Sequence, residues 1–216
     1  MDALLFDMDG VVVDSEAYWH DTEREELLPG VLDGEIPDLE EITGMPYREI
    51  YDYLDANYET TVSKATFVER YDDAAATIYR EQVELLDSFH EIQATAREAG
   101  VPVGLVSSSP PTWITYVLDR FDLAFDLTLS NDEAPGPGKP APDIYESAAD
   151  RLGVEPSACV AVEDSRNGSL AAQRAGMVVV GYRVGHNAET DLSACDVVCE
   201  GSAELREELL RRLEDA

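Results

Sequence analysis

The chain begins, over residues 1–13, with the stretch MDALLFDMDGVVV, in which a short apolar run leads directly into Asp7, Asp9 and Gly10. A buried strand over residues 3–6 would therefore deliver two carboxylates to solvent at its end. Neighbouring carboxylates repel each other and are costly to bury unless a cation or a proton-transfer role compensates them. Asp and Gly also form ordinary turns, so this stretch alone leaves both a turn and a reactive site open.

Short apolar runs alternate with amphipathic segments of helical length along the rest of the chain. The predicted strands cover residues 3–6, 102–106, 123–129, 158–162, 177–182 and 196–198. Core helices are predicted over residues 89–99, 111–119, 142–152, 166–175 and 203–214. Strands that alternate with helices favour an α/β fold, and we expect a Rossmann-like parallel sheet with helices on both faces.

A long helical segment separates the first and second predicted strands. It spans about ninety residues, far more than an ordinary crossover needs. We therefore expect residues 15–87 to form a small inserted helical cap domain, and residues 1–14 and 88–216 to form the catalytic core. Helices are predicted in this insert over residues 15–28, 38–42, 47–57 and 63–86, with a break at Pro29-Gly30.

The charge of the chain is unusual. The 216 residues include 15 basic and 46 acidic side chains, which give a net charge of −31. Such self-repulsion destabilises a compact protein unless salt screens it, and at about 1 M salt the Debye length falls to roughly 3 Å. Scattered acidity with only two lysines, Lys64 and Lys139, indicates a halophilic protein from a high-salt cytoplasm. No basic stripe is present to meet phosphates, which argues against a nucleic-acid partner.

The cysteines and the N-terminal stretch support the same setting. Cys159, Cys195 and Cys199 stand in apolar, strand-like runs, so we expect buried thiols rather than a metal site or disulfides. The opening apolar run is broken by acidic residues and lacks a basic leader, which argues against a signal peptide or a membrane span. We expect a cytoplasmic protein with no membrane partner, either a monomer or a weak homodimer.

Polar residues follow several predicted strands. Ser107 ends the run Leu105-Val106-Ser107, Lys139 lies in Gly138-Lys139-Pro140, and Glu163-Asp164 follows the run over residues 158–162. The carboxyl ends of parallel strands meet at one edge of a sheet, where ligands bind. We therefore expect these residues to converge with Asp7 and Asp9.

The order of these motifs resembles the haloacid dehalogenase-like superfamily, in its subgroup of β-phosphoglucomutase-like and phosphoglycolate phosphatase-like enzymes with a helical cap. The resemblance covers nearly the whole chain, and four motifs in order are far more specific than a single DxDG. It implies that Asp7 is a nucleophile that forms an aspartyl-phosphate, and that Asp9 is the general acid and base. Relatives that dehalogenate lack this second acid, so its presence favours phosphoryl transfer.

The resemblance also implies a Mg²⁺ site. The cation would lie on the Asp7 carboxylate, the Asp9 backbone carbonyl and Asp164, with Glu163 either a direct ligand or one water away. A hard divalent cation held by oxygen ligands would offset the repulsion between the nucleophile and an anionic phosphate. The alternative for Glu163-Asp164 is a solvated helix N-terminus, which the helix dipole also favours.

Two further core motifs are expected to bind phosphate. Ser107 would hydrogen-bond the phosphoryl oxygens, together with the amides of Ser108 and Ser109 at the start of a helix, although serines before two prolines also cap helices. Lys139 would balance the charges of Asp7 and the phosphate, and the alternative is a surface loop lysine.

The cap offers weaker candidates for substrate contact, each of which could equally be a core or surface residue. They are Ser15, Glu16, Trp19, His20 and the turn Gly44-Met45-Pro46-Tyr47-Arg48. Arg48 is preferred among them, because capped relatives place a phosphate-reading cation near it. Trp19 stands where many capped relatives carry a His that couples cap closure to catalysis, which counts against a mutase.

The sequence thus predicts a Mg²⁺-dependent phosphatase that acts on a small phosphorylated metabolite. One alternative is a sugar-phosphate mutase, which must keep its aspartyl-phosphate from water. Another is a non-catalytic phosphometabolite-binding protein on the same scaffold. Such a protein would be expected to lose a nucleophile, an acid or a metal ligand, whereas Asp7, Asp9, Lys139 and Asp164 are all present.

The charge of the chain generates a prediction about salt. Lowering KCl from molar to millimolar levels should lower the melting temperature, because unscreened carboxylates then repel each other. Differential scanning calorimetry over a KCl series measures the effect. A melting temperature that is indifferent to KCl would remove the inference of a halophilic protein.

Overall fold

In the computed structural model, which describes residues 1–42 and 45–216, the strands of the described residues form one parallel sheet in the order β3-β2-β1-β4-β5-β6. The strands are β1 (Ala3–Phe6), β2 (Val103–Ser107), β3 (Leu127–Ser130), β4 (Cys159–Glu163), β5 (Val178–Arg183) and β6 (Val197–Glu200). Every residue of β1, β2 and β4 is buried. Parallel strands are covered on both faces, which is why these three are apolar almost throughout.

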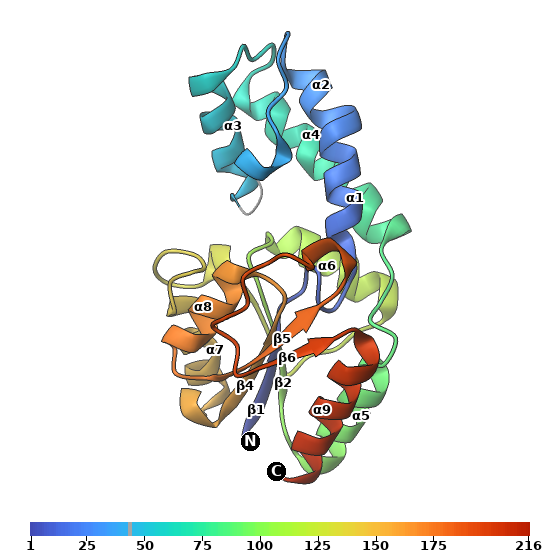
Figure 1. Cartoon of the computed structure of the whole chain (residues 1–216), viewed down its shortest axis with the longest axis vertical. Helices are drawn as coiled ribbons and strands as arrows, with labels where there is room; N and C mark the ends of the chain where they lie inside the picture. The colour runs from blue at the N-terminus through green and yellow to red at the C-terminus, as the bar shows by residue number, and fades with distance from the viewer. Residues whose placement is uncertain (43–44) are drawn as a thin grey trace. The chain divides into compact units, whose positions relative to one another are not determined.

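Helices cover both faces of the sheet (Figure 1). On one face, α7 (Asp143–Leu152) and α8 (Arg166–Arg174) pack on Ala3, Leu5 and Ala161 in one apolar cluster. On the other face lies α5 (Phe89–Ala99), whose Phe89 meets Phe6 edge-on at 5.2 Å between ring centroids. The remaining core helices are α6 (Pro111–Phe121) and α9 (Ser202–Glu214), with short 3₁₀ turns over Asn131–Glu133, Pro156–Ala158 and Gly185–Asn187. The predicted α/β, Rossmann-like fold is confirmed.

The third strand is shorter than predicted. It begins at Leu127, not at residue 123, because α6 ends at Phe121 and the next residue, Asp122, adopts a left-handed conformation with φ 51°. The side chain of Asp126 then accepts a hydrogen bond of 2.8 Å from the amide of Val103. Residues 123–126 therefore form a loop that connects α6 to β3.

The chain divides into two compact units, of which the core comprises Met1–Asp14 and Glu84–Ala216 and the helical insert comprises Ser15–Val83. The second junction lies after Val83, before the predicted position at Asp87-Ser88. Residues 84–86 belong to the core because they run antiparallel to residues 12–14. The amide of Leu86 donates to the carbonyl of Val12 at 2.9 Å, and the amide of Asp14 donates to that of Glu84 at 3.2 Å. The predicted helix over residues 63–86 consequently ends at Gln82.

The helical insert starts with a continuous helical run, formed by α1 (Ser15–Thr22), a π-helical turn (Glu23–Leu27) and α2 (Leu28–Val31). The predicted break at Pro29-Gly30 is wrong, because Pro29 lies in the first turn of α2, where a missing N–H is tolerated. A 3₁₀ turn (Leu39–Glu41), α3 (Tyr47–Asn57), α4 (Lys64–Thr77) and a second π-helical turn (Ile78–Gln82) complete the insert. Among the described residues, no helix is long and apolar enough to cross a bilayer.

Stacked aromatic rings form the core of the insert. The ring of Tyr71 stacks on Phe67, with ring centroids 4.5 Å apart, and also on Trp19 and Tyr47 at 5.9 Å and 6.0 Å. Its hydroxyl donates to the buried carboxylate of Glu23 at 3.2 Å. Burial raises the pKa of Glu23 to about 7, although the hydrogen bond from Tyr71 opposes the shift.

This buried acid generates a prediction about stability. The pKa of Glu23 rises from an ordinary 4.5 to about 7 in the folded protein. The folded state therefore binds more protons between these two values, so stability is lost as the pH rises through this window. At 1.36 kcal/mol per unit the full loss above pH 7 is roughly 3 kcal/mol. Glu23→Gln should recover roughly 1–3 kcal/mol at pH 8 and much less at pH 5.

Urea denaturation at both pH values and one fixed salt concentration measures this difference. Glu25→Gln is the matched control, because Glu25 lies in the same π-helical turn but is exposed. It removes the same charge without relieving burial. A gain from Glu23→Gln that is equal at the two pH values, or equal to that of the control, would contradict the prediction.

Candidate active site

The candidate site lies at the carboxyl edge of the sheet, between β1 and β4. The strand order reverses at this point, and open parallel sheets bind ligands there. Asp7 follows β1 directly, and its amide still pairs with the carbonyl of Val162 at 3.0 Å. Glu163 is the last residue of β4 and Asp164 follows it. The sheet therefore brings the carboxylate of Asp7 close to those of Glu163 and Asp164, which lie far from it in the sequence.

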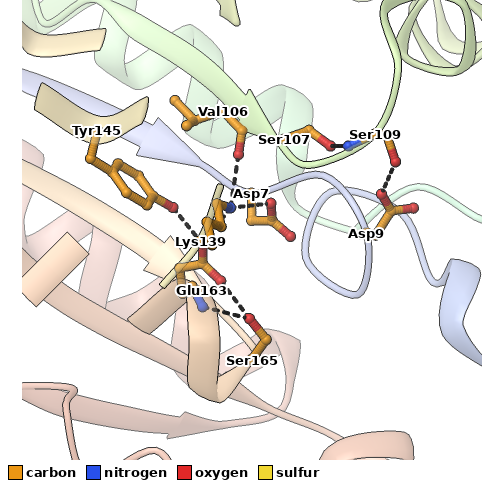
Figure 2. A network of polar contacts seen from close by, with 10 residues as sticks. Asp7, Asp9, Val106, Ser107, Ser109, Lys139, Tyr145, Glu163 and Ser165 are labelled. Carbon is orange, nitrogen blue, oxygen red and sulfur yellow. Dashed lines mark hydrogen bonds and ion pairs between the residues drawn. The ribbon is translucent and has the colours of Figure 1, made fainter. Parts of the chain in front are cut away.

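Lys139 joins the strands at this edge, as Figure 2 shows. Its Nζ lies 2.6 Å from Asp7 Oδ1 and 2.6 Å from Glu163 Oε1, and it donates to the carbonyl of Val106 at 3.1 Å. The Lys139 side chain is only 6% exposed. Burial by itself would lower the pKa of Lys139, but the charges of Asp7 and Glu163 outweigh it and raise the pKa. Lys139 is therefore a buried ammonium, and the alternative of a surface lysine is wrong.

Negative charge exceeds positive charge in this cluster. Burial raises the pKa of Asp7 well above its ordinary value, and the nearby carboxylates of Glu163, Asp164 and Asp9 add to the shift that Lys139 opposes. Burial and Glu163 likewise raise the pKa of Asp164. Ligand oxygens of Asp7, Glu163 and Asp164 all lie within 4.8 Å of one another. A set of hard oxygen donors with surplus negative charge fits a divalent cation, and one would relieve the crowding that raises these pKa values.

Glu163 is fixed through both of its oxygens. Oε1 accepts hydrogen bonds from Lys139 and from the hydroxyl of Tyr145, and Oε2 accepts one of 3.3 Å from Ser165. The Ser165 hydroxyl also caps α8 by accepting from the amide of Gly168 at 3.0 Å. A Cβ on Gly168 would lie 1.9 Å from Glu163 Oε2, so the start of α8 closes tightly on this carboxylate.

Asp164 is held by the loop that follows β5. His186 Nε2 lies 3.0 Å from Asp164 Oδ2, and the side-chain amide of Asn187 donates to the carbonyls of Asp164 and Tyr182, each at 2.8 Å. Arg183 anchors the same loop by donating to the carbonyl of Ala188 at 2.8 Å. His186 and Asn187 were not predicted from the sequence. Their position just after the carboxyl end of a predicted strand could have indicated that they lie near the site.

Ser107 and Ser109 connect β2 to the second aspartate. Ser109 donates from its hydroxyl to Asp9 Oδ2 at 2.7 Å, and its amide donates to Ser107 Oγ at 3.0 Å. Ser130 supports them from β3 by donating to the carbonyl of Ser109 at 2.7 Å. Ser107 and Ser130 are fully buried. These contacts orient the Asp9 carboxylate at the same edge of the sheet.

The predicted start of α6 at residue 111 is confirmed, but Ser108 and Ser109 do not form its first turn. The helix α6 begins at Pro111, so both serines lie in the loop before it, with Ser108 exposed and Ser109 buried. Proline fits the first position of a helix and disfavours helical geometry in the residue before it, which explains the start at Pro111. The amide of Ser109 is already donated to Ser107.

The candidate residues of the helical insert are described within that unit. Ser15 is buried, and Glu16 and His20 are half-buried in α1. The indole of Trp19 donates to the hydroxyl of Tyr79 at 3.0 Å and stacks on Tyr71, so it belongs to the aromatic core of the insert.

The candidate turn at residues 44–48 is only partly described, since Gly44 lies outside the described residues. Met45 and Pro46 are exposed, and Tyr47 is buried. The exposed guanidinium of Arg48 lies over the ring of Tyr47, 4.6 Å from its centroid. Substrate contact by any of the insert residues stays a prediction.

Comparison with known proteins identifies the class. A family model of haloacid dehalogenase-like hydrolases matches residues 1–176. Hexitol phosphatase B of Escherichia coli (strain K12) is 36% identical over 182 residues, which cover 81% of this chain and 80% of the relative. The chain therefore belongs to the haloacid dehalogenase-like hydrolases, as the sequence predicted, and it is an enzyme of that family.

Two further relatives cover most or all of the chain. A phosphorylated carbohydrates phosphatase of Thermotoga maritima is 30% identical over 190 residues, which cover 87% of this chain and 87% of the relative. The crystal structure of a putative β-phosphoglucomutase, also from Thermotoga maritima, is similar with a TM-score of 0.75 and 28% identity over 100% of both chains.

The turn after Asp9 generates a prediction about Asp164. Gly10 has φ +76°, and a Cβ there would lie 2.0 Å from Asp164 Oδ2 and 3.0 Å from His186 Nε2. In Gly10→Ala the carboxylate of Asp164 must therefore leave its place, and we expect divalent-cation affinity to fall by about tenfold or more. Calorimetric titration with MgCl₂ measures this loss.

Gly176→Ala is the matched control, because Gly176 has φ +82° and no atom within 4 Å of the added Cβ. Both variants carry roughly 1 kcal/mol of left-handed strain, but only Gly10→Ala displaces Asp164. Equal cation affinities in the two variants would show that Asp164 does not contribute to a cation site.

Proposed function

We propose that this protein is a Mg²⁺-dependent phosphatase, which hydrolyses a small phosphorylated metabolite through an aspartyl-phosphate on Asp7. The observation that carries the proposal is the buried ammonium of Lys139 between Asp7 and Glu163, at 2.6 Å from each. A buried lysine bound to a carboxylate at the ligand-binding edge of a parallel sheet suits the binding of a second anion there.

Asp7 is the proposed nucleophile. Lys139 holds Asp7 Oδ1 at 2.6 Å, which leaves Oδ2 to attack phosphorus. A bond then forms between Oδ2 and phosphorus while the ester bond from phosphorus to the leaving oxygen breaks. Lys139 remains in place throughout and offsets the charge of the phosphoryl group as a point cation.

Asp9 is the proposed proton carrier. The Ser109 hydroxyl fixes Asp9 Oδ2 at 2.7 Å. In the first step Asp9 gives its proton to the leaving alkoxide. In the second step it takes a proton from the water that attacks phosphorus, which releases inorganic phosphate and restores the Asp7 carboxylate. Phosphate contact by Ser107, whose hydroxyl already accepts from Ser109, would use its remaining donor capacity.

Mg²⁺ would be held by Asp7, Asp164 and the backbone carbonyl of Asp9. When bound, it supplies the positive charge that an anionic nucleophile and an anionic phosphate require. His186 and Asn187 would fix the Asp164 side chain and backbone during the reaction, through their contacts of 3.0 Å and 2.8 Å. Closure of the helical insert as a cap would exclude bulk water from the occupied site.

The substrate is proposed to be a phosphorylated sugar or sugar alcohol, because the relatives above 30% identity include a hexitol phosphatase. A sugar-phosphate mutase is the second candidate, and the likeness to a putative β-phosphoglucomutase favours it. Trp19 weighs against a mutase, since its indole is bound to Tyr79 in the insert core. The net charge of −31 supports a salt-rich cytoplasm as the place of action.

Hydrolysis of p-nitrophenyl phosphate with MgCl₂ in high KCl tests the proposed nucleophile. Asp7→Asn should lower kcat by about 10⁴-fold or more, because an amide oxygen does not form the phosphoenzyme. Asp119→Asn is the matched control, since Asp119 is exposed on α6, and it should retain the wild-type rate.

Equal rates for Asp7→Asn and wild type would refute the proposed nucleophile. A labelled hexose 1-phosphate, added to the same assay, separates the two candidate functions. Release of inorganic phosphate alone supports a phosphatase, whereas label in hexose 6-phosphate supports a mutase.

A further inference from the structure

Tyr145 is a buried side chain of α7 that none of the proposed steps uses. Its hydroxyl donates to Glu163 Oε1, the same oxygen that accepts from Lys139 Nζ at 2.6 Å. Its ring centroid lies 5.2 Å from that Nζ. Both Tyr145 and Glu163 are fully buried. In Figure 2 the phenol points at Glu163, and Asp7 lies on the other side of Lys139.

The contacts of Lys139 explain what this hydroxyl can do. An ammonium has three donors, and here they meet Asp7 Oδ1, Glu163 Oε1 and the carbonyl of Val106. Asp7 and Glu163 therefore compete for one cation. A second donor on Glu163 Oε1 reduces the negative charge that this oxygen presents to Lys139, and it leaves Lys139 more strongly bound to Asp7.

The same hydrogen bond restricts where Glu163 can turn. Oε1 already accepts from two donors and Oε2 accepts from Ser165 at 3.3 Å. With these three hydrogen bonds, the Glu163 carboxylate has few lone pairs left to coordinate a cation bound at Asp164. Without the phenol, Oε1 would keep only Lys139 and could rotate toward that position.

We propose that Tyr145 is a positioning residue, whose hydroxyl keeps Glu163 out of direct cation coordination and thereby keeps Lys139 on Asp7. The inference rests on the proposed function, because it assigns Glu163 an indirect role in the same cation site. Tyr145 touches neither the substrate nor the reacting atoms in this assignment.

Tyr145→Phe tests the proposal, since it removes one oxygen and retains the ring. We expect kcat to fall about tenfold, with KM for the phosphate ester changed by less than about twofold, because Lys139 shifts from Asp7 to Glu163. We also expect Mg²⁺ to bind about threefold more tightly or better in calorimetric titrations, because Glu163 gains a free lone pair and adds negative charge to the site. Slower turnover with tighter cation binding is a pattern that general loosening of the fold would not produce.

Tyr51→Phe is the matched control. It removes the same oxygen from a half-buried tyrosine of the helical insert, whose hydroxyl donates to the carbonyl of Val62 at 2.9 Å. It should lose a similar amount of stability and leave kcat and Mg²⁺ affinity at wild-type values. If Tyr145→Phe matches this control in both quantities, or if its Mg²⁺ affinity falls, the proposal is overturned.

A double-mutant cycle with Glu163→Gln shows whether Tyr145 acts through Glu163. A neutral amide adds no charge to the cation site, so the effect of Tyr145→Phe on Mg²⁺ affinity should vanish in the Glu163→Gln background. An effect of unchanged size in that background would overturn the proposal. The titrations report this coupling whether or not the protein hydrolyses phosphate esters, so failure of the proposed function is distinguishable from failure of this inference.

Discussion

One buried ammonium has to serve several buried carboxylates, and the architecture of the core depends on this constraint. Lys139 contacts Asp7, Glu163 and the carbonyl of Val106, and so connects the ends of β1, β4 and β2. These strands are neighbours in the sheet order, which is what lets a single side chain reach all three. A charge buried without a partner costs far more than a hydrogen bond returns. The central strands and the Lys139 loop are therefore coupled through electrostatics as well as packing.

Neutral donors also hold the acidic residues of this cluster. Ser165 and Tyr145 bind Glu163, Ser109 binds Asp9, and Asn187 binds the backbone of Asp164. A hydrogen bond to a charged group contributes about 1.5–3 kcal/mol, which lowers the cost of the cluster but leaves its net charge unchanged. The surplus charge persists in the raised pKa values of Asp7 and Asp164, which burial and the neighbouring carboxylates cause. This is the electrostatic state that a divalent cation would complete.

The sequence predicted which carboxylates converge at this edge better than it predicted the residues that support them. The apolar runs predicted the sheet because its central strands are buried on both faces, and the carboxyl-edge rule then placed Asp7 near Glu163. Tyr145 could not be found in this way, because its contact depends on how α7 packs on the sheet, and no local pattern records that packing. The start of α6 at Pro111 was predicted, but the role of the preceding serines was not, because Ser107 and Ser109 bond to each other rather than capping the helix. Trp19 shows the same limit, since only the structure reveals its bond to Tyr79.

The chemistry of the ammonium explains why the buried cation of so acidic a chain is a lysine. Thirteen of the 15 basic residues are arginine, but the buried partner of Asp7 and Glu163 is Lys139. An arginine carries five donors in a planar fork, whereas among the described residues Lys139 donates to three acceptors, which belong to three different strand ends. A guanidinium there would leave buried donors unsatisfied, at about 1–3 kcal/mol each. The ammonium of Lys139 has one donor for each of these acceptors. Replacing Lys139 with arginine would therefore keep the positive charge but disrupt this set of hydrogen bonds.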